Sequence, residues 1–160
     1  MDKKNNSLRG FTLVELLAVI VVLAIVMLIA LQAVLPAMDS ARRQTFAIEA
    51  NGAIDAANTY FVSSMLTGDP NSGLPVNEGK TVCVEISTLY QAGYTELNPD
   101  NYSGKVEVVK KGSLYLYTVY IEKNKAMMVN GAGSDADSNV DIDESNVVDY
   151  NAETFKGTCD

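Results

Sequence analysis

The chain has 160 residues, of which twelve are basic and twenty acidic, so its net charge at pH 7 is −8. It contains no His and no Trp, and only two Cys. The lack of His removes the commonest general base and metal ligand, and two cysteines are too few for a zinc site made of Cys alone. No spacing gathers a nucleophile, a base and an oxyanion donor, so we expect no enzyme activity. The acidic balance argues against direct nucleic-acid binding through a basic surface.

The N-terminal part of the chain contains a short basic segment followed by a long apolar one. Residues 1–10 are polar and basic, and residues 16–31 carry no polar side chain. With its flanks the run reaches about 25 mostly apolar residues, which is enough to span a bilayer core of roughly 30 Å. A secretory signal peptide would have a shorter apolar region. We therefore predict a membrane-spanning helix over 11–35, with the N-terminus in the cytoplasm and residues 36–160 outside.

The helix is predicted to continue beyond the membrane as an amphipathic half over 36–67. Pro36 should kink it, because proline removes a backbone donor and crowds the preceding turn. Apolar residues then recur at spacings of three and four, which indicates one buried face. These residues are Phe46, Ala50, Ala53, Ile54, Ala57, Phe61 and Met65. Gly68 and Pro70 predict the end of the helix.

Residues 68–160 predict a globular head built on an antiparallel sheet. Turn-forming residues fill 69–80, and residues 86–92 suit a short helix that Gly93 ends. Strands are predicted at 105–110, 114–122 and 125–129, with a tight turn at Lys123-Asn124. The second strand is apolar on both faces, which places it in the middle of the sheet. The predicted fold class is α+β: a long N-terminal helix, kinked at Pro36, with an antiparallel β-meander packed on its second half.

The sequence G-F-T-L-V-E-L at residues 10–16 stands directly before the apolar run. It resembles the signal of type IV prepilins and pseudopilins, in which a short basic leader is cleaved after Gly and the new N-terminal Phe is methylated. The fifth residue of the mature chain in those families is Glu. Gly10, Phe11 and Glu15 match this pattern residue by residue. The resemblance is specific over residues 1–66, and beyond them it covers only the general layout.

The resemblance implies a lollipop-shaped structural subunit that is made as a single-pass precursor in the cytoplasmic membrane. A prepilin peptidase would remove the leader, residues 1–10, and methylate the amine of Phe11. A membrane assembly platform with a cytoplasmic ATPase would then add the subunit to an extracellular filament of identical or related pilin subunits. No cofactor is implied for this role.

Glu15 is the one carboxylate at the entrance of the apolar helix. An ionised side chain among apolar residues in a bilayer is costly, although less so near the interface. Cleavage after Gly10 would create a cationic partner, the α-amine of Phe11. In a filament, that amine would neutralise Glu15 of a neighbour and set the axial register. The simpler interpretation is a Glu that lies near the lipid headgroups at little cost.

Cys83 and Cys159 both lie outside the membrane on this topology, in a compartment where disulfides persist. A bond between them would pin the C-terminal tail to the start of the head. The loop-entropy model gives about 4 kcal/mol for so long a loop. Two free thiols are the alternative.

The C-terminal region is acidic, and its stretch 135–144 offers oxygen ligands at alternate positions. The calcium candidates are Asp135, Asp137, Asn139 and Asp141. The first three resemble the opening of an EF-hand loop, but Val140 stands where that loop needs glycine. We therefore favour a solvated acidic loop over a calcium site.

We predict a structural subunit of a type IV pilus-like surface filament that serves adhesion, motility or aggregation. The first alternative is a pseudopilin or minor pilin of type II secretion or of competence DNA uptake, which would use the same N-terminal helix. The second is a membrane-anchored extracellular binding module that does not polymerise. Lys105, Lys110 and Lys111 are the only close basic group in the head, which is little for direct contact with DNA.

Overall fold

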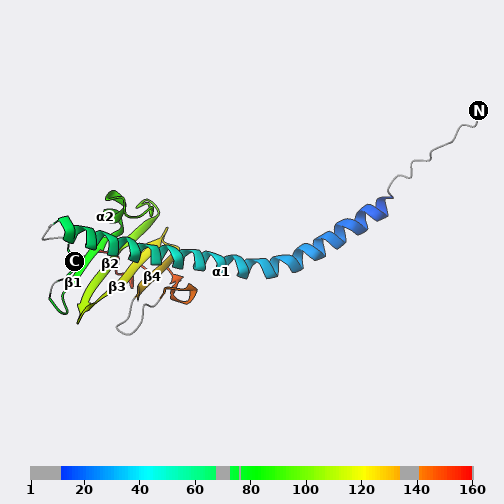
Figure 1. Ribbon diagram of the computed structural model, residues 1–160. Helices are drawn as coiled ribbons and strands as arrows, with labels where there is room; N and C mark the ends of the chain where they lie inside the picture. Colours follow the sequence, from blue (N-terminus) through cyan, green and yellow to red (C-terminus); the bar gives the residue numbers. More distant parts are fainter. Residues whose placement is uncertain (1–11, 68–72, 76, 134–140, 160) are drawn as a thin grey trace, which may run out of the picture. The chain divides into compact units, whose positions relative to one another are not determined.

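The computed structural model describes residues 12–67, 73–75, 77–133 and 141–159 (Figure 1). One long helix, α1 (Leu13–Thr67), comes first, and a sheet with a short helix follows it. The chain divides into two compact units, Met1–Asp39 and Ser40–Asp160. The described part of the first unit is the apolar half of α1. The second unit contains the rest of α1 and the whole sheet, so the fold is α+β as the sequence predicts.

The sheet has five strands in the order β1-β2-β3-β4-β5, and every neighbouring pair is antiparallel. The strands are β1 (Thr81–Glu85), β2 (Tyr102–Lys111), β3 (Leu114–Lys123), β4 (Met127–Gly133) and β5 (Val148–Asp149). The sequence predicts β2, β3 and β4 and correctly places β3 in the middle. It misses β1 and β5, because a strand of five residues between a loop and a helix, or one of two residues, carries too short an alternating pattern.

The turn between β3 and β4 differs from the sequence prediction. Asn124 and Lys125 have φ angles of 52° and 53°, and the N–H of Ala126 donates to the carbonyl oxygen of Lys123 at 3.0 Å. This hydrogen bond closes a β-turn whose two central φ angles are positive, and a turn of that kind matches the right-handed twist of the strands that it joins. The prediction of a strand beginning at Lys125 is therefore wrong, and β4 begins at Met127.

Within the second unit, α1 packs against one face of the sheet (Figure 1). The buried residues of α1 are mostly alanines with a phenylalanine towards each end: Phe46, Ala47, Ala50, Ala53, Ala56, Ala57 and Phe61. Alanine lets the helix backbone approach the strands closely, and the rings of Phe46 and Phe61 are the large fully buried side chains of this face. The predicted face is wrong only at Met65, which is 55% exposed. Ser64 is buried in its place and donates to the carbonyl oxygen of Tyr60 at 2.9 Å.

The sheet contributes the other side of this core. Val119 and Ile121 of β3, together with Val106 and Val108 of β2, are fully buried. They alternate along their strands, as residues on one face of a sheet must. Lys105 and Glu107 of β2 and Tyr120 of β3 occupy the alternate positions, so their side chains lie on the second face of the sheet.

The short helix α2 (Ile86–Gln91) ends one residue earlier than the predicted 86–92, with Ala92 as its C-cap and Gly93, the predicted stop, directly after it. Gly93 has a φ angle of 78°, which is the left-handed conformation that a glycine adopts without strain. Its N–H donates to Tyr90 at 3.0 Å, and the N–H of Tyr94 donates to Leu89 at 2.9 Å. These two bonds satisfy the last carbonyl groups of the helix. Ile86 and Leu89 thereby face the core.

The C-terminal residues return to α1 after the sheet. Ile142 and Val147 are both buried and belong to the core cluster. Between them lies a 3-10 turn, η1 (Glu144–Asn146), which Asp143 caps by accepting from the N–H of Ser145 at 2.8 Å. This part of the acidic region is therefore packed and hydrogen-bonded.

Candidate functional site

The first described residues of α1 form a reciprocal cap. The N–H and the hydroxyl of Thr12 each donate to Oε2 of Glu15 at 2.9 Å, and the N–H of Glu15 donates to the hydroxyl of Thr12 at 3.3 Å. This arrangement is a capping box, which satisfies backbone N–H groups that have no partner within the helix. Glu15 therefore has a structural partner within its own chain.

The sequence contained the signal for this cap. A Thr followed three residues later by Glu, immediately before an apolar helix, is the standard pattern for a capping box. Thr12, whose part in the cap the sequence prediction does not include, is a functional residue of this site beside Glu15. The cleavage residues Gly10 and Phe11 lie outside the described residues.

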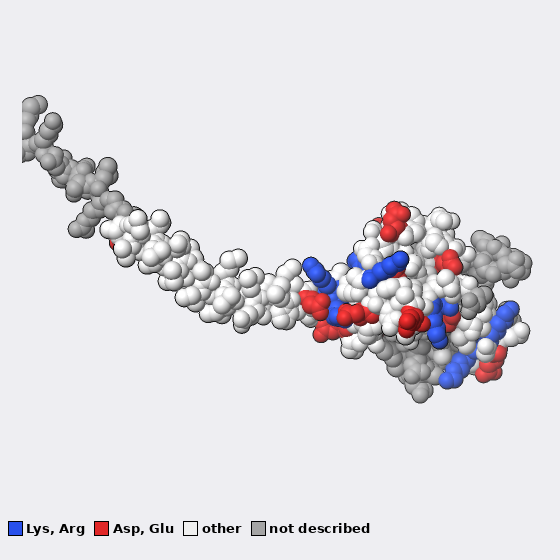
Figure 2. Space-filling view, turned by 180° about the vertical axis from the view of Figure 1, so that it is seen from behind, with Lys and Arg blue, Asp and Glu red and all other residues white. Residues whose placement is uncertain are grey.

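The apolar side chains of the first half of α1 are exposed in the described part of the chain. Every large apolar side chain from Leu13 to Leu35 is at least 46% exposed. Figure 2 shows this stretch of the helix almost without charged residues, whereas Lys, Arg, Asp and Glu gather on the second unit. By length and composition, α1 is the one helix in the described chain that can cross a membrane. A helix that is apolar on all sides needs a lipid or protein environment.

Pro36 lies inside α1, which runs on to Thr67. Proline has no N–H, so the carbonyl group of Gln32 lacks its usual helical donor at this point. The kink itself stays a prediction.

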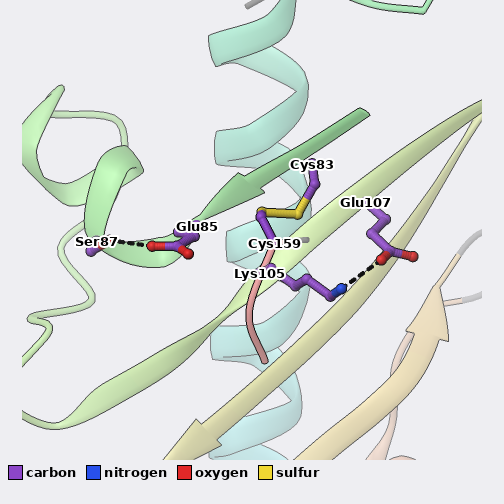
Figure 3. Close-up of a disulfide and its surroundings, with 6 residues drawn as sticks. All are labelled: Cys83, Glu85, Ser87, Lys105, Glu107 and Cys159. Atoms are coloured by element: carbon purple, nitrogen blue, oxygen red, sulfur yellow. Dashed lines mark hydrogen bonds and ion pairs between the residues drawn. A yellow bond between two sulfur atoms is a disulfide. The ribbon is translucent and has the colours of Figure 1, made fainter. Parts of the chain in front are cut away.

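A disulfide joins Cys83 of β1 to Cys159, across a sequence separation of 76 residues (Figure 3). The sequence prediction of this bond is confirmed. Since β1 is an edge strand, the bond attaches the C-terminal segment to one edge of the sheet.

Lys105 lies near this disulfide on β2, as Figure 3 shows. Its side chain is 7% exposed, and its Nζ is 2.7 Å from Oε1 of Glu107. The same Nζ lies 5.2 Å from the centre of the Tyr120 ring. A buried ammonium group requires such partners, because its loss of hydration is otherwise uncompensated. Lys105 is therefore a paired interior charge and contributes little to a basic surface.

A second ionic contact ties α1 to the sheet. Nζ of Lys123 on β3 lies 2.8 Å and 2.9 Å from the two carboxylate oxygens of Glu49, and 4.9 Å from the centre of the Tyr102 ring. Burial opposes the charge on Lys123, but the hydrogen bond and the charge of Glu49 outweigh it, so the pKa of Lys123 is raised. This contact holds the helix in register with the strands.

The acidic C-terminal region supplies hydrogen-bond acceptors to α1. Glu144 accepts from Ser40 at 2.6 Å and from Gln44 at 3.2 Å, and Asp149 accepts from Arg43 at 2.8 Å. Glu144, at the end of the stretch 135–144 expected to be a solvated loop, is exposed and also bonded to α1, and Asp149 lies beyond that stretch. Their carboxylates are partners of the helix as well as surface charges.

The described structure does not bring the calcium candidates together. Asp135, Asp137 and Asn139 lie outside the described residues, and Asp141 is exposed. Among the described residues, no group of three or more acidic, Cys or His side chains could hold a metal ion. No cofactor is indicated for this part of the chain.

A family model provides the link to known proteins. The prokaryotic N-terminal methylation motif matches residues 5–31 of this chain. That range contains the predicted cleavage position, the Thr12–Glu15 cap and most of the apolar run. No match was found to a curated protein or to a solved structure.

Together, the motif and the exposed apolar helix define a protein with a prepilin-type N-terminus. The chain carries the signal motif of type IV pilins, which supports a type IV pilin-like or pseudopilin-like protein. The motif also implies processing by a prepilin peptidase and a membrane-anchored precursor. Type IV pilins are structural proteins, and the α+β head on α1 is consistent with their architecture.

Proposed function

We propose that this chain is a structural, non-enzymatic subunit of a type IV pilus-like filament on the cell surface. It is inserted into the cytoplasmic membrane as a precursor and cleaved between Gly10 and Phe11. It then joins its neighbours through the apolar half of α1. The methylation motif at the start of an unpartnered apolar helix is the observation that carries this proposal.

The exposed apolar surface supports both stages of this life cycle. Lipid tails cover the side chains of residues 13–35 in the precursor, and equivalent helices of other subunits cover them in the filament. The two environments are similarly apolar, so a subunit can pass from one to the other without exposing this surface to water.

The cap at the helix start suggests how Glu15 acts in assembly. Both hydrogen bonds from Thr12 go to Oε2, so the cap uses one carboxylate oxygen and orients the side chain. We assign the other oxygen, Oε1, to the α-amine of Phe11 in a neighbouring subunit. The pairing of these charges in an apolar environment would fix the axial step between subunits.

Three variants separate the charge of Glu15 from its role in the cap. Glu15→Ala removes both. Glu15→Gln keeps the cap, because Gln serves equally at this position, but removes the charge. Thr12→Ala weakens the cap and keeps the charge. We expect all three precursors to insert and lose their leader, and only Thr12→Ala to form filaments.

The assay is electron microscopy of sheared filaments, with mass spectrometry of the subunit to confirm cleavage. Filaments from Glu15→Gln would show that charge pairing is not needed. If Thr12→Ala is the one variant of the three that forms no filaments, assembly depends on the cap and not on the charge of Glu15. If the Glu15→Ala subunit is cleaved and still assembles into filaments, Glu15 has no role in assembly.

The motif is equally compatible with a pseudopilin or minor pilin of a secretion or DNA-uptake system. The distinguishing observation is abundance: a major pilin is the main band of sheared filaments, and a minor subunit is a trace component. An anchored binding module that does not polymerise would remain with the membrane after shearing.

A further inference from the structure

The chain contains two Asn-Gly pairs in different structural settings, Asn51-Gly52 and Asn130-Gly131. In this dipeptide the backbone nitrogen of Gly can attack the side-chain amide of the preceding Asn, because glycine has no side chain to obstruct the approach and few conformational restrictions. Asn is accordingly among the chemically labile residues of proteins. The surrounding structure decides which of the two pairs can react.

Asn51 is held in place from two directions. It lies inside α1, where helical geometry fixes the backbone of Gly52. Its side-chain amide donates to the carbonyl oxygen of Ile142 at 2.8 Å and accepts from the N–H of Ile142 at 3.0 Å. Reaction at this position would require the helix to open and both hydrogen bonds to break.

Asn130 lies at an irregular point of β4. The register of β3 and β4 pairs Tyr120 with Asn130 and then Val119 with Ala132, so it passes over Gly131. Gly131 has a φ angle of 85°, and both Asn130 and Gly131 are exposed. The extra residue of a bulge is outside the regular ladder, so its backbone is easier to rearrange than that of a paired residue.

One contact restrains the side chain of Asn130. Its Nδ2 donates to the carbonyl oxygen of Thr154 at 2.9 Å. Thr154 belongs to the segment 150–159, which begins with a hydrogen bond from Tyr150 to Ala126 at 3.1 Å and ends at the disulfide of Cys159. The C-terminal segment thus holds the amide that would have to turn towards Gly131.

We propose that Asn130 is a site of deamidation whose rate is controlled by the C-terminal segment. The backbone nitrogen of Gly131 forms a bond to Cγ of Asn130, the bond from Cγ to Nδ2 breaks, and ammonia leaves after protonation. Water then opens the resulting cyclic imide at either carbonyl group. The products are aspartate and isoaspartate at position 130.

The reaction changes the contact that controls it. An Asn amide has a donor group, whereas an ionised carboxylate has only acceptors. A carboxylate at position 130 would therefore face the carbonyl oxygen of Thr154 without a hydrogen between them. The segment 150–159 loses the hydrogen bond at Thr154 and gains a repulsion between two oxygen atoms. The residues around Thr154 are therefore released from β4 as deamidation proceeds.

The first experiment follows both Asn-Gly pairs in one sample of the full chain in detergent micelles at mildly alkaline pH. Digestion at acidic pH and peptide mapping by mass spectrometry give the two conversion rates, and a parallel denatured sample gives the rates without structure. We expect Asn130 to convert in the folded protein several times faster than Asn51, with a larger ratio than in the denatured sample. Folded Asn130 as protected as Asn51, or an unchanged ratio, overturns the proposal. Asn130→Gln is the variant that should remain unmodified, because its longer side chain forms the ring much more slowly.

The second experiment tests control by the C-terminal segment. In the double variant Cys83→Ser, Cys159→Ser, Asn130 should convert several times faster while Asn51 keeps its rate. An unchanged Asn130 rate overturns the control. If the deamidation of Asn51 also accelerates, the head has opened, and the variant Asn130→Asp with the disulfide intact is tested instead.

This variant mimics the aspartate product. Compared with the unmodified protein, it should show faster hydrogen exchange in residues 150–158 and unchanged exchange around Ile142. If exchange in residues 150–158 is also unchanged, the coupling is refuted.

Discussion

Asn51 on α1 and Ile142 in the C-terminal region exchange two hydrogen bonds, of 2.8 Å and 3.0 Å. A single side-chain amide thereby satisfies the N–H and the carbonyl group of one backbone residue, as a neighbouring strand would. Ile142 itself is 4% exposed and belongs to the core cluster. This pair joins the C-terminal region to the helix at a partly buried position, whereas the contacts of Glu144 with Ser40 and Gln44 are exposed.

Replacing Asn51 should destabilise the head. Asn51→Ala leaves the polar backbone groups of Ile142 without their partners at a partly buried position, which should lower the free energy of unfolding by about 1–3 kcal/mol. Chemical denaturation followed by circular dichroism measures the change. Thr59→Ala is the control: Thr59 is exposed on the same helix, and we expect a change within about 0.5 kcal/mol. Equal effects of the two substitutions would contradict the role of the Asn51–Ile142 pair.

The disulfide should be a large contributor to stability. Its sequence separation of 76 residues means that it restricts a long loop of the unfolded chain. The double variant Cys83→Ser, Cys159→Ser should unfold with about 4 kcal/mol less free energy. Denaturation with and without reductant tests this. Reductant should weaken the unmodified protein and leave the double variant unaffected, and a reductant effect on the variant would point to another cause.

Two adjacent residues of α1 should respond in opposite directions to added side-chain volume. Ala53 is fully buried against the sheet, so Ala53→Leu should overpack the core and cost about 1–3 kcal/mol. Gly52 is exposed, and a Cβ placed on it meets nothing within 4 Å. Gly52→Ala should therefore stabilise the subunit by about 0.5–1 kcal/mol through helix propensity. Thermal unfolding in detergent measures both, and a destabilising Gly52→Ala would show that this helix face has a partner within the subunit.

Tyr117 should make the head sensitive to alkaline pH. Burial, with a smaller contribution from Tyr115, raises the pKa of Tyr117 from 10.0 to about 12. Between these values the unfolded chain has lost the phenolic proton that the folded chain retains. The free energy of unfolding therefore falls as pH rises through this window, and this contribution is fully present only below pH 10.

Tyr117→Phe tests this dependence, because Phe keeps the ring and cannot ionise. Denaturant titrations at several pH values should show a shallower decline for the variant between pH 10 and 12. The variant also loses the hydrogen bond from Tyr117 to Asn58, and the difference at neutral pH measures that loss separately. Parallel declines in both proteins would rule out Tyr117 as the titrating group.

Local patterns in the sequence determine the long helix, its buried face and the three central strands of this protein. The apolar run, the methylation motif, the buried face of α1 and the three central strands all depend on residues close together in the chain, where periodicity and spacing carry the information. The Thr12–Glu15 cap belongs to the same class, because its two residues are three positions apart. Its signal, Thr followed three residues later by Glu before an apolar run, is local.

Tertiary structure decided what the remaining residues do. β1 and β5 are too short to be recognised alone and exist because β2 and β4 offer them free edges. Glu144 and Asp149 are indistinguishable in sequence from solvated acidic residues, and only folding brings Ser40 and Arg43 to them. Likewise, two identical Asn-Gly pairs acquire different surroundings, one clamped in a helix and one at a strand bulge. Such differences arise from contacts between residues that are distant in sequence, from 24 positions for Asn130 and Thr154 to 106 for Arg43 and Asp149, which no local pattern encodes.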